Sequence, residues 1–142
     1  MNFLVDTNVL SEVTRAVPNP QVLSWLDRLD EDRAFISVIT LAEIRRGIAI
    51  MPDGRRRASL LDWLEKDLPQ RFEHRIVPIN PPVAFAWGDL MGRARQVGRG
   101  LSSMDGLIAA TAIVGSFTLA TRNTKDFDGF DIPLINPWIA SA

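Results

Sequence analysis

The chain has 142 residues, 46% of them hydrophobic, which suits one domain around a single core and excludes an intrinsically disordered protein. It contains no cysteine, which excludes a disulfide framework and a zinc–thiolate site. The net charge of −1 gives no sign of nucleic-acid binding by bulk charge. No apolar run approaches the roughly 20 residues of a membrane span, and the first residues lack the pattern of a signal peptide. We therefore expect a cytoplasmic protein with no membrane association.

Short β-like segments alternate with longer helical patterns along the chain. Strands are predicted at 3–5, 34–39, 75–79, 117–120 and 133–135. Helices are predicted from residue 20 onward and at 40–51, 55–68, 82–97 and 103–114. Strands that alternate with helices favour a parallel sheet with helices on both faces. We therefore predict an α/β fold, a three-layer α/β/α domain with a central parallel sheet of about five strands, and residues 1–142 as one domain.

The first predicted strand, in the stretch FLVDTNVLSE, ends in a carboxylate, Asp6. Burying an ionised group is costly unless the group is paired or binds a metal. Parallel sheets bind their ligands beyond the carboxyl ends of the strands, so Asp6 falls on the expected functional edge. Thr7 and Asn8 follow directly and can orient this carboxylate or cap the helix after it.

Three further acids fall on the same predicted edge. Glu43 and Asp105 lie in the first turns of two predicted helices, and Asp126 follows the fourth strand, close to Asn123. In this architecture the helices start beside the carboxyl ends of the strands, so their first-turn residues and the segment after the fourth strand are expected to converge there. The sequence therefore predicts an acidic pocket formed with Asp6.

Each of these acids also has a purely structural interpretation. The sequence TLAE at 40–43 has the pattern of a capping box, in which Glu43 would bond the backbone of Thr40, and SSMD at 102–105 resembles one. Acids in the first turn of a helix also interact favourably with the helix dipole without any catalysis. Several acids on one edge are harder to explain in this way than a single acid.

A pocket of several carboxylates either holds protons or binds a cation, because like charges repel. Oxygen ligands without thiols or clustered histidines suit Mg²⁺ or Mn²⁺, and such sites serve phosphodiester hydrolysis. The phosphate-binding patterns GxxxxGK and GxGxxG are absent, which weakens a nucleotide-triphosphate or dinucleotide function. His74 is the single histidine and is distant from these segments in the sequence, so we expect a surface or capping residue.

Four segments together resemble those of PIN-domain proteins, and most of all the VapC and FitB toxins of type II toxin–antitoxin modules. They are FLVDTNVLSE, ISVITLAEIRRGI, LSSMDGLIAATA and LATRNTKDFDGF followed by PLINPW. The resemblance covers essentially the whole chain. It implies a PIN-like fold, Mg²⁺-dependent endoribonuclease activity with Mn²⁺ as an alternative metal, and a cognate VapB- or FitA-like antitoxin as partner. It also implies a homodimer that forms a heterotetramer or larger assembly with the antitoxin and binds operator DNA only through that complex.

Through this resemblance the catalytic and metal-binding positions fall on Asp6, Glu43, Asp105 and Asp126. Asp6 and Asp105 are expected to hold one Mg²⁺ directly, while Glu43 and Asp126 contact it through water or complete a second site. Many relatives carry an aspartate where this chain has Asn123, so either Asn123 or Asp126 fills the fourth position. Supporting roles are expected for Thr7, Asn8, Ser103, Thr121 and Asn123.

Two other functions fit parts of the sequence. The chain and its antitoxin could act mainly as a DNA-binding autorepressor complex with weak or no nuclease activity. The antitoxin would then supply the DNA contacts, because this chain has no net basic charge. An aspartyl phosphatase with Asp6 as nucleophile is disfavoured, because DTN lacks the second aspartate that such enzymes generally need two residues later.

Two further groups of residues are candidates for contacts with partners. The arginines near the predicted edge could bind RNA phosphates or acidic antitoxin residues, or could simply be solvated: Arg45, Arg46, Arg93, Arg95 and Arg99. A groove for an antitoxin helix could be lined by Leu41, Ile44, Ile48, Leu60 and Leu64. Packing in the core of the monomer is the simpler interpretation for some of the latter.

Overall fold

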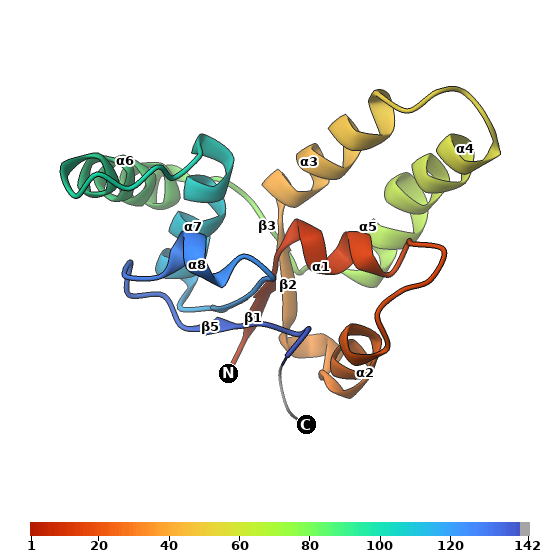
Figure 1. Cartoon of the computed structure of the whole chain (residues 1–142), viewed down its shortest axis with the longest axis horizontal. Helices are drawn as coiled ribbons and strands as arrows, with labels where there is room; N and C mark the ends of the chain where they lie inside the picture. The colour runs from red at the N-terminus through yellow and green to blue at the C-terminus, as the bar shows by residue number, and fades with distance from the viewer. Residues whose placement is uncertain (140–142) are drawn as a thin grey trace.

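The computed structural model describes residues 1–139 (Figure 1). The strands are β1 (Phe3–Val5), β2 (Ala34–Ser37), β3 (Ile76–Val77), β4 (Thr118–Ala120) and β5 (Leu134–Ile135). The helical elements are α1 (Thr7–Glu12), α2 (Pro20–Arg28), the 3₁₀ turn η1 (Glu31–Arg33), α3 (Val38–Ala49), α4 (Arg55–Asp62), the π-helical turn η2 (Trp63–Asp67), α5 (Leu68–Arg71), α6 (Pro81–Gln96), α7 (Ser103–Gly115) and α8 (Thr124–Phe127). Within residues 1–139, no helix has the length and apolar character needed to cross a membrane.

The five strands form one parallel sheet in the order β3-β2-β1-β4-β5. In the central register, Leu4 of β1 pairs with Phe35 of β2 and with Leu119 of β4. Strands β2 and β3 lie in succession on one side of β1, and β4 and β5 lie in succession on its other side. The carboxyl ends of β1 and β4 therefore flank the switch point of the sheet, where open parallel sheets bind ligands.

Successive side chains of β1 point to opposite faces of the sheet, and each enters a different core. Leu4 is fully buried and packs with residues of α6, α7 and α8. Val5, also fully buried, packs with residues of α1, α2, α3 and the η2–α5 segment. Figure 1 shows α6 and α7 on one side of the sheet and α3, α4 and α5 on the other. The predicted three-layer α/β/α architecture is thus confirmed, and β1 is fixed from both faces.

Helices α6 and α7 pack closely because Gly106 places no side chain at their contact. A Cβ atom at this position would lie 2.5 Å from Sδ of Met91 and 3.0 Å from Nε1 of Trp87. The Trp87 indole instead donates a hydrogen bond to the carbonyl of Ser103 (3.1 Å). This bond fixes the first turn of α7, which carries Asp105.

The predicted boundary between the second strand and its following helix is wrong by two residues. β2 ends at Ser37, whose Oγ accepts a hydrogen bond from the N–H of Ile39 (3.0 Å) and caps α3. The helix therefore starts at Val38, and Glu43 lies in its second turn. The capping-box interpretation of residues 40–43 is wrong, because Thr40 is already inside the helix.

The single helix predicted at 55–68 is divided in the structure. After α4 comes the π-helical turn η2, in which the N–H of Leu68 bonds the carbonyl of Trp63 five residues earlier. Pro69 follows and has no N–H to offer the carbonyl of Glu65. The chain nevertheless stays helical through α5, because Leu68 and Phe72 are buried in the core on this side of the sheet.

Candidate active site

Asp6 lies at the switch point, and only 4% of its surface is exposed. One carboxylate oxygen, Oδ1, accepts a hydrogen bond from the N–H of Thr7 (2.8 Å) and caps α1. The other oxygen, Oδ2, accepts a bond from the hydroxyl of Thr121 (2.8 Å), just beyond β4. The backbone N–H of Asp6 donates to the carbonyl of Ala120 (2.9 Å). The carboxylate is therefore oriented by the two elements that flank the switch point.

The surroundings of Asp6 disfavour its charged form. Burial is the largest cause and, with the other effects, raises the pKa of Asp6 from its ordinary 3.8 to about 6. The hydrogen bonds from Thr121 and Thr7 lower this pKa and offset part of the rise, whereas repulsion from Asp105 and Glu43 adds to it. A cation beside Asp6 would relieve both the desolvation and the repulsion.

Glu43 reaches the site through the hydroxyl of Thr7, which donates to its Oε1 (2.6 Å). Thr7 thus joins the two acids, because its N–H binds Asp6 while its side chain binds Glu43. Its hydroxyl also lies 3.2 Å from Oγ1 of Thr40. Since a hydroxyl carries one hydrogen, Thr7 gives that hydrogen to Glu43, and Thr40 becomes the donor in the second contact. Thr40 was not among the predicted site residues.

Asp105 is half-buried in the first turn of α7. Its N–H donates to Oγ of Ser102 (3.2 Å), so the predicted cap at this helix is present. Burial raises the pKa of Asp105, a hydrogen bond with Ser102 lowers it, and repulsion from Asp126 raises it further. Ser103 is exposed and contributes through its carbonyl, which accepts the bond from Trp87.

The segment after β4 is tied to α1 by a small polar network. Asn8 donates through Nδ2 to the hydroxyl oxygen of Thr121 (3.3 Å) and accepts at Oδ1 from the N–H of Arg122 (3.2 Å). The N–H of Asn123 also donates to the Thr121 hydroxyl oxygen (3.1 Å). Asp126 is exposed in α8 and acts on Asp105 by charge. Both candidates for the fourth position thus lie in the segment that leaves β4.

Arg99 holds this segment in place. Its guanidinium donates to the carbonyls of Lys125 (3.0 Å), Asp126 (3.3 Å) and Asp128. It also stacks over the ring of Phe130, with Cζ 4.8 Å from the ring centroid. Cations favour the carboxyl end of a helix, so Arg99 stabilises the end of α8. The roles expected for Arg99 were binding an RNA phosphate or an acidic antitoxin residue, or simple exposure to solvent; these contacts give it a structural role instead.

Two more of the predicted RNA-binding arginines are already paired with acids. Nη1 of Arg45 lies 3.1 Å from Oε1 of Glu65, and Nη1 of Arg93 lies 3.7 Å from Oδ2 of Asp131. These pairs are exposed, and such pairs contribute little to stability. They nevertheless reduce the free positive charge that Arg45 and Arg93 can offer to a phosphate.

The carboxylate oxygens of these acids are the donor atoms that a hard divalent cation prefers. They act on one another in pairs: Asp6 with Glu43, Asp6 with Asp105, and Asp105 with Asp126. No group of three His, Cys, Asp or Glu side chains within residues 1–139 is arranged to hold a metal ion. Mg²⁺ keeps several waters and is held by one or two carboxylates in many proteins, so a pair of acids meets its needs. Ligands that are all oxygen exclude a preference for softer metals.

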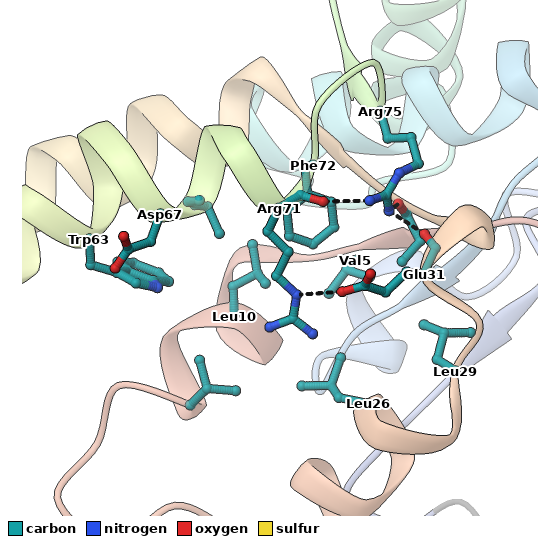
Figure 2. A pocket seen from close by; sticks show the side chains of 13 residues that line it. Val5, Leu10, Leu26, Leu29, Glu31, Trp63, Asp67, Arg71, Phe72 and Arg75 are labelled. Carbon is teal, nitrogen blue, oxygen red and sulfur yellow. Dashed lines mark hydrogen bonds and ion pairs between the residues drawn. The ribbon is translucent and has the colours of Figure 1, made fainter.

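A cavity lies on the Val5 side of the sheet, and none of these acids lines it (Figure 2). This cavity has a volume of about 160 Å³. Its apolar walls are formed by Val5, Leu10, Val13, Leu26, Leu29, Ala34, Trp63, Leu68 and Phe72. At its rim, Arg71 pairs with Glu31 (Nε–Oε1 3.5 Å). The antitoxin groove predicted from the sequence is wrong in part, because its members Ile44, Ile48 and Leu64 are buried in the core.

Comparisons with known proteins cover nearly the whole chain. The PIN domain family matches residues 3–132. Toxin FitB of Neisseria gonorrhoeae is 40% identical over 136 residues, which are 96% of this chain and 98% of FitB. VapC ribonuclease Y4jK of Sinorhizobium fredii is 38% identical over 136 residues, 96% of this chain and 97% of that protein. The solved structure of FitAB bound to an IR36 DNA fragment superposes with a TM-score of 0.92 at 38% identity, covering 99% of this chain and 98% of that one.

Proposed function

The chain belongs to the PIN domain family, and we propose that it is the toxin of a type II toxin–antitoxin module and a metal-dependent endoribonuclease, with residues 1–142 as a single PIN domain. The resemblance inferred from its sequence motifs is confirmed. The observation that carries the ribonuclease proposal is the buried carboxylate of Asp6 at the switch point, with Glu43 and Asp105 close enough to raise its pKa. A solvent-exposed acid with only a capping role would have none of these features.

The acids would hold the metal as follows. Asp6 and Asp105 would bind one Mg²⁺, for which Mn²⁺ could substitute, while Glu43 and Asp126 would contact it through water or complete a second site. When bound, a divalent metal lowers the pKa of a water molecule and stabilises the charge that develops on the phosphate. Asn123 is the alternative to Asp126 at the fourth position.

The remaining residues orient these acids. Glu43, held by the hydroxyl of Thr7, would orient or deprotonate the attacking water. Thr121 keeps Asp6 directed toward the edge of the sheet, and Asn8 and Ser103 support the two helix starts that carry the acids. Asp6 has a pKa of about 6, so near neutral pH it is largely ionised and able to bind a cation.

The partner proposed for this chain is a cognate antitoxin. The relative FitB, named a toxin, is found in the FitAB complex on DNA. The present chain has a net charge of −1, so in a corresponding complex the antitoxin would supply most contacts with operator DNA. The same DNA-bound complex favours a second candidate function, in which the toxin and antitoxin act mainly as an autorepressor and nuclease activity is weak.

Cleavage of total RNA by the purified, antitoxin-free chain tests the two functions. The reactions contain Mg²⁺, Mn²⁺ or EDTA. They compare wild type with Asp6→Asn, which keeps the capping oxygen, and with Asp27→Asn, which removes an exposed acid of α2. Metal-dependent cutting that is lost only in Asp6→Asn supports the ribonuclease. No cutting by the folded, metal-replete wild type would favour the autorepressor.

A further inference from the structure

Arg122 lies at the border of the acidic site without an ion pair to any other residue in 1–139. It directly follows Thr121, whose hydroxyl binds Asp6. Its backbone is fixed on both sides, since its N–H donates to Asn8 (3.2 Å) and its carbonyl accepts from Nδ2 of Asn136 (3.4 Å). These two bonds fix the backbone from which the Arg122 side chain starts.

The guanidinium of Arg122 is also held in place. Its Cζ lies 5.0 Å from the ring centroid of Trp138. Trp138 is half-buried against the core, and its backbone N–H donates to Oδ1 of Asn136 (2.9 Å). Stacking on such a ring attracts a cation but uses none of its N–H donors.

Glu12 is the acid whose charge attracts Arg122, but both of its carboxylate oxygens already accept hydrogen bonds from other residues. Glu12 is buried and acts on Arg122 by charge, yet its oxygens accept bonds from the N–H of Asn19 (2.8 Å) and from Arg15 (3.2 Å). The guanidinium of Arg122 makes no hydrogen bond to any residue in 1–139, in contrast to that of Arg99, which is committed to backbone carbonyls.

We propose that Arg122, held on the ring of Trp138, binds a backbone phosphate of the RNA strand beside the bond that is cleaved. The proposal rests on the ribonuclease function proposed above. Without a metal the acidic pocket repels a polyanion, and a cation at its border offsets part of this repulsion. A planar guanidinium with free donors binds phosphate in bidentate fashion. Such a contact positions the strand and carries no sequence information.

Direct RNA binding tests this contact independently of cleavage. A fluorescein-labelled single-stranded RNA of mixed sequence is titrated with the antitoxin-free chain in EDTA, and anisotropy gives Kd over a range of KCl concentrations. The variants are Arg122→Gln, Arg122→Lys and the control Arg33→Gln. Arg33 is an exposed arginine in η1, at the opposite end of the sheet, with no ion pair in the described part of the chain. Thermal melts confirm that each variant is folded.

The expected result is that Arg122→Gln raises Kd about tenfold, the loss of a charge-assisted hydrogen bond. The slope of log Kd against log salt should fall by about one. Arg122→Lys should keep most of the slope, and Arg33→Gln should match wild type. The proposal is overturned if the wild type does not bind the RNA, or if Arg122→Gln and Arg33→Gln behave alike. Weaker antitoxin binding by Arg122→Gln with unchanged RNA binding would also overturn it, in favour of a protein contact.

A parallel cleavage assay with Mg²⁺ separates this proposal from the one on which it rests. A wild type that binds RNA through Arg122 but does not cut it would refute the ribonuclease and leave the phosphate contact standing. A wild type that cuts RNA, with KM and salt dependence unchanged in Arg122→Gln, would refute the contact and leave the ribonuclease. When both proposals hold, Arg122→Gln raises KM and leaves kcat nearly unchanged.

Discussion

Replacing Asp6 with asparagine should stabilise the metal-free protein at alkaline pH while abolishing its activity. The pKa of Asp6 is raised from 3.8 to about 6, so the folded protein binds this proton more tightly than the unfolded chain does. The stability that the proton provides is complete below about pH 4. It is lost as the pH rises through 6, because the buried carboxylate then becomes charged.

The size of the effect follows from these two pKa values. Their difference corresponds to about 3 kcal/mol of destabilisation by the charged form. Asparagine removes the charge but loses the bond from the Thr121 hydroxyl, whose oxygen already accepts from Asn8 and Asn123, at a cost of about 1 kcal/mol. The net gain is about 2 kcal/mol near pH 8, or about 4–8 °C in Tm for a domain of this size.

The assay is urea and thermal unfolding in EDTA, across the pH range, of wild type, Asp6→Asn and the exposed control Asp27→Asn. Asp6→Asn should exceed wild type near pH 8 and fall slightly below it near pH 4, whereas the control should follow wild type throughout. An Asp6→Asn protein that is less stable than wild type at alkaline pH would refute the reasoning. A gain of equal size at both ends of the pH range would do so too, because it would not depend on ionisation.

Three further predictions concern metal binding, the contact of Thr7 with Glu43, and the hydrogen bonds of Arg99. Mg²⁺ should raise the Tm of wild type near neutral pH, since it binds only the folded state, and an equal rise in Asp6→Asn would place the ion elsewhere. Thr7→Val should lower kcat about tenfold by removing the bond to Glu43, with Thr7→Ser restoring it; failure of the serine variant to restore kcat would assign the loss to packing. Arg99→Gln should raise severalfold the Mg²⁺ concentration that gives half-maximal activity, because α8 and its C-cap residue Asp128 lose three hydrogen bonds. Arg93→Gln removes a surface ion pair and a stacking contact with Phe130 but no hydrogen bond to α8, and it should leave this concentration unchanged.

The edge of the sheet that carries the site is predictable from the sequence because it depends on chain order alone. Asp6, Glu43 and Asp126 each follow a strand within six residues, and Asp105 lies at the start of the helix that leads into β4. Parallel strands direct their carboxyl ends to one edge, and a helix that returns to the next strand starts at that edge. That argument brought Asp6, Glu43 and Asp105 to one place without knowledge of any contact. It also placed the fourth position in the segment after β4, where both Asn123 and Asp126 are found.

The roles of individual side chains were less predictable, because their partners are distant in the sequence. Thr40 and Glu43 match a local capping pattern, yet both meet Thr7, more than 30 residues away. Ser37, the last residue of β2, caps the helix instead, so the helix starts at Val38. From the sequence, Arg99 has the features of a solvated cation. In the fold it binds carbonyls of α8 and its C-cap residue, which lie 26 to 29 residues later in the chain. Such contacts have no local signal.

The strand order also has a consequence during synthesis on the ribosome. Asp6 is made first, but the hydroxyl that orients it belongs to Thr121, 115 residues later, and β1 stays an open edge until β4 is made. A nascent or prematurely released chain lacking β4 therefore cannot assemble the site, and its unpaired β1 favours aggregation. For a nuclease that would degrade RNA in the cell that makes it, translation itself delays activity until nearly the whole chain has emerged.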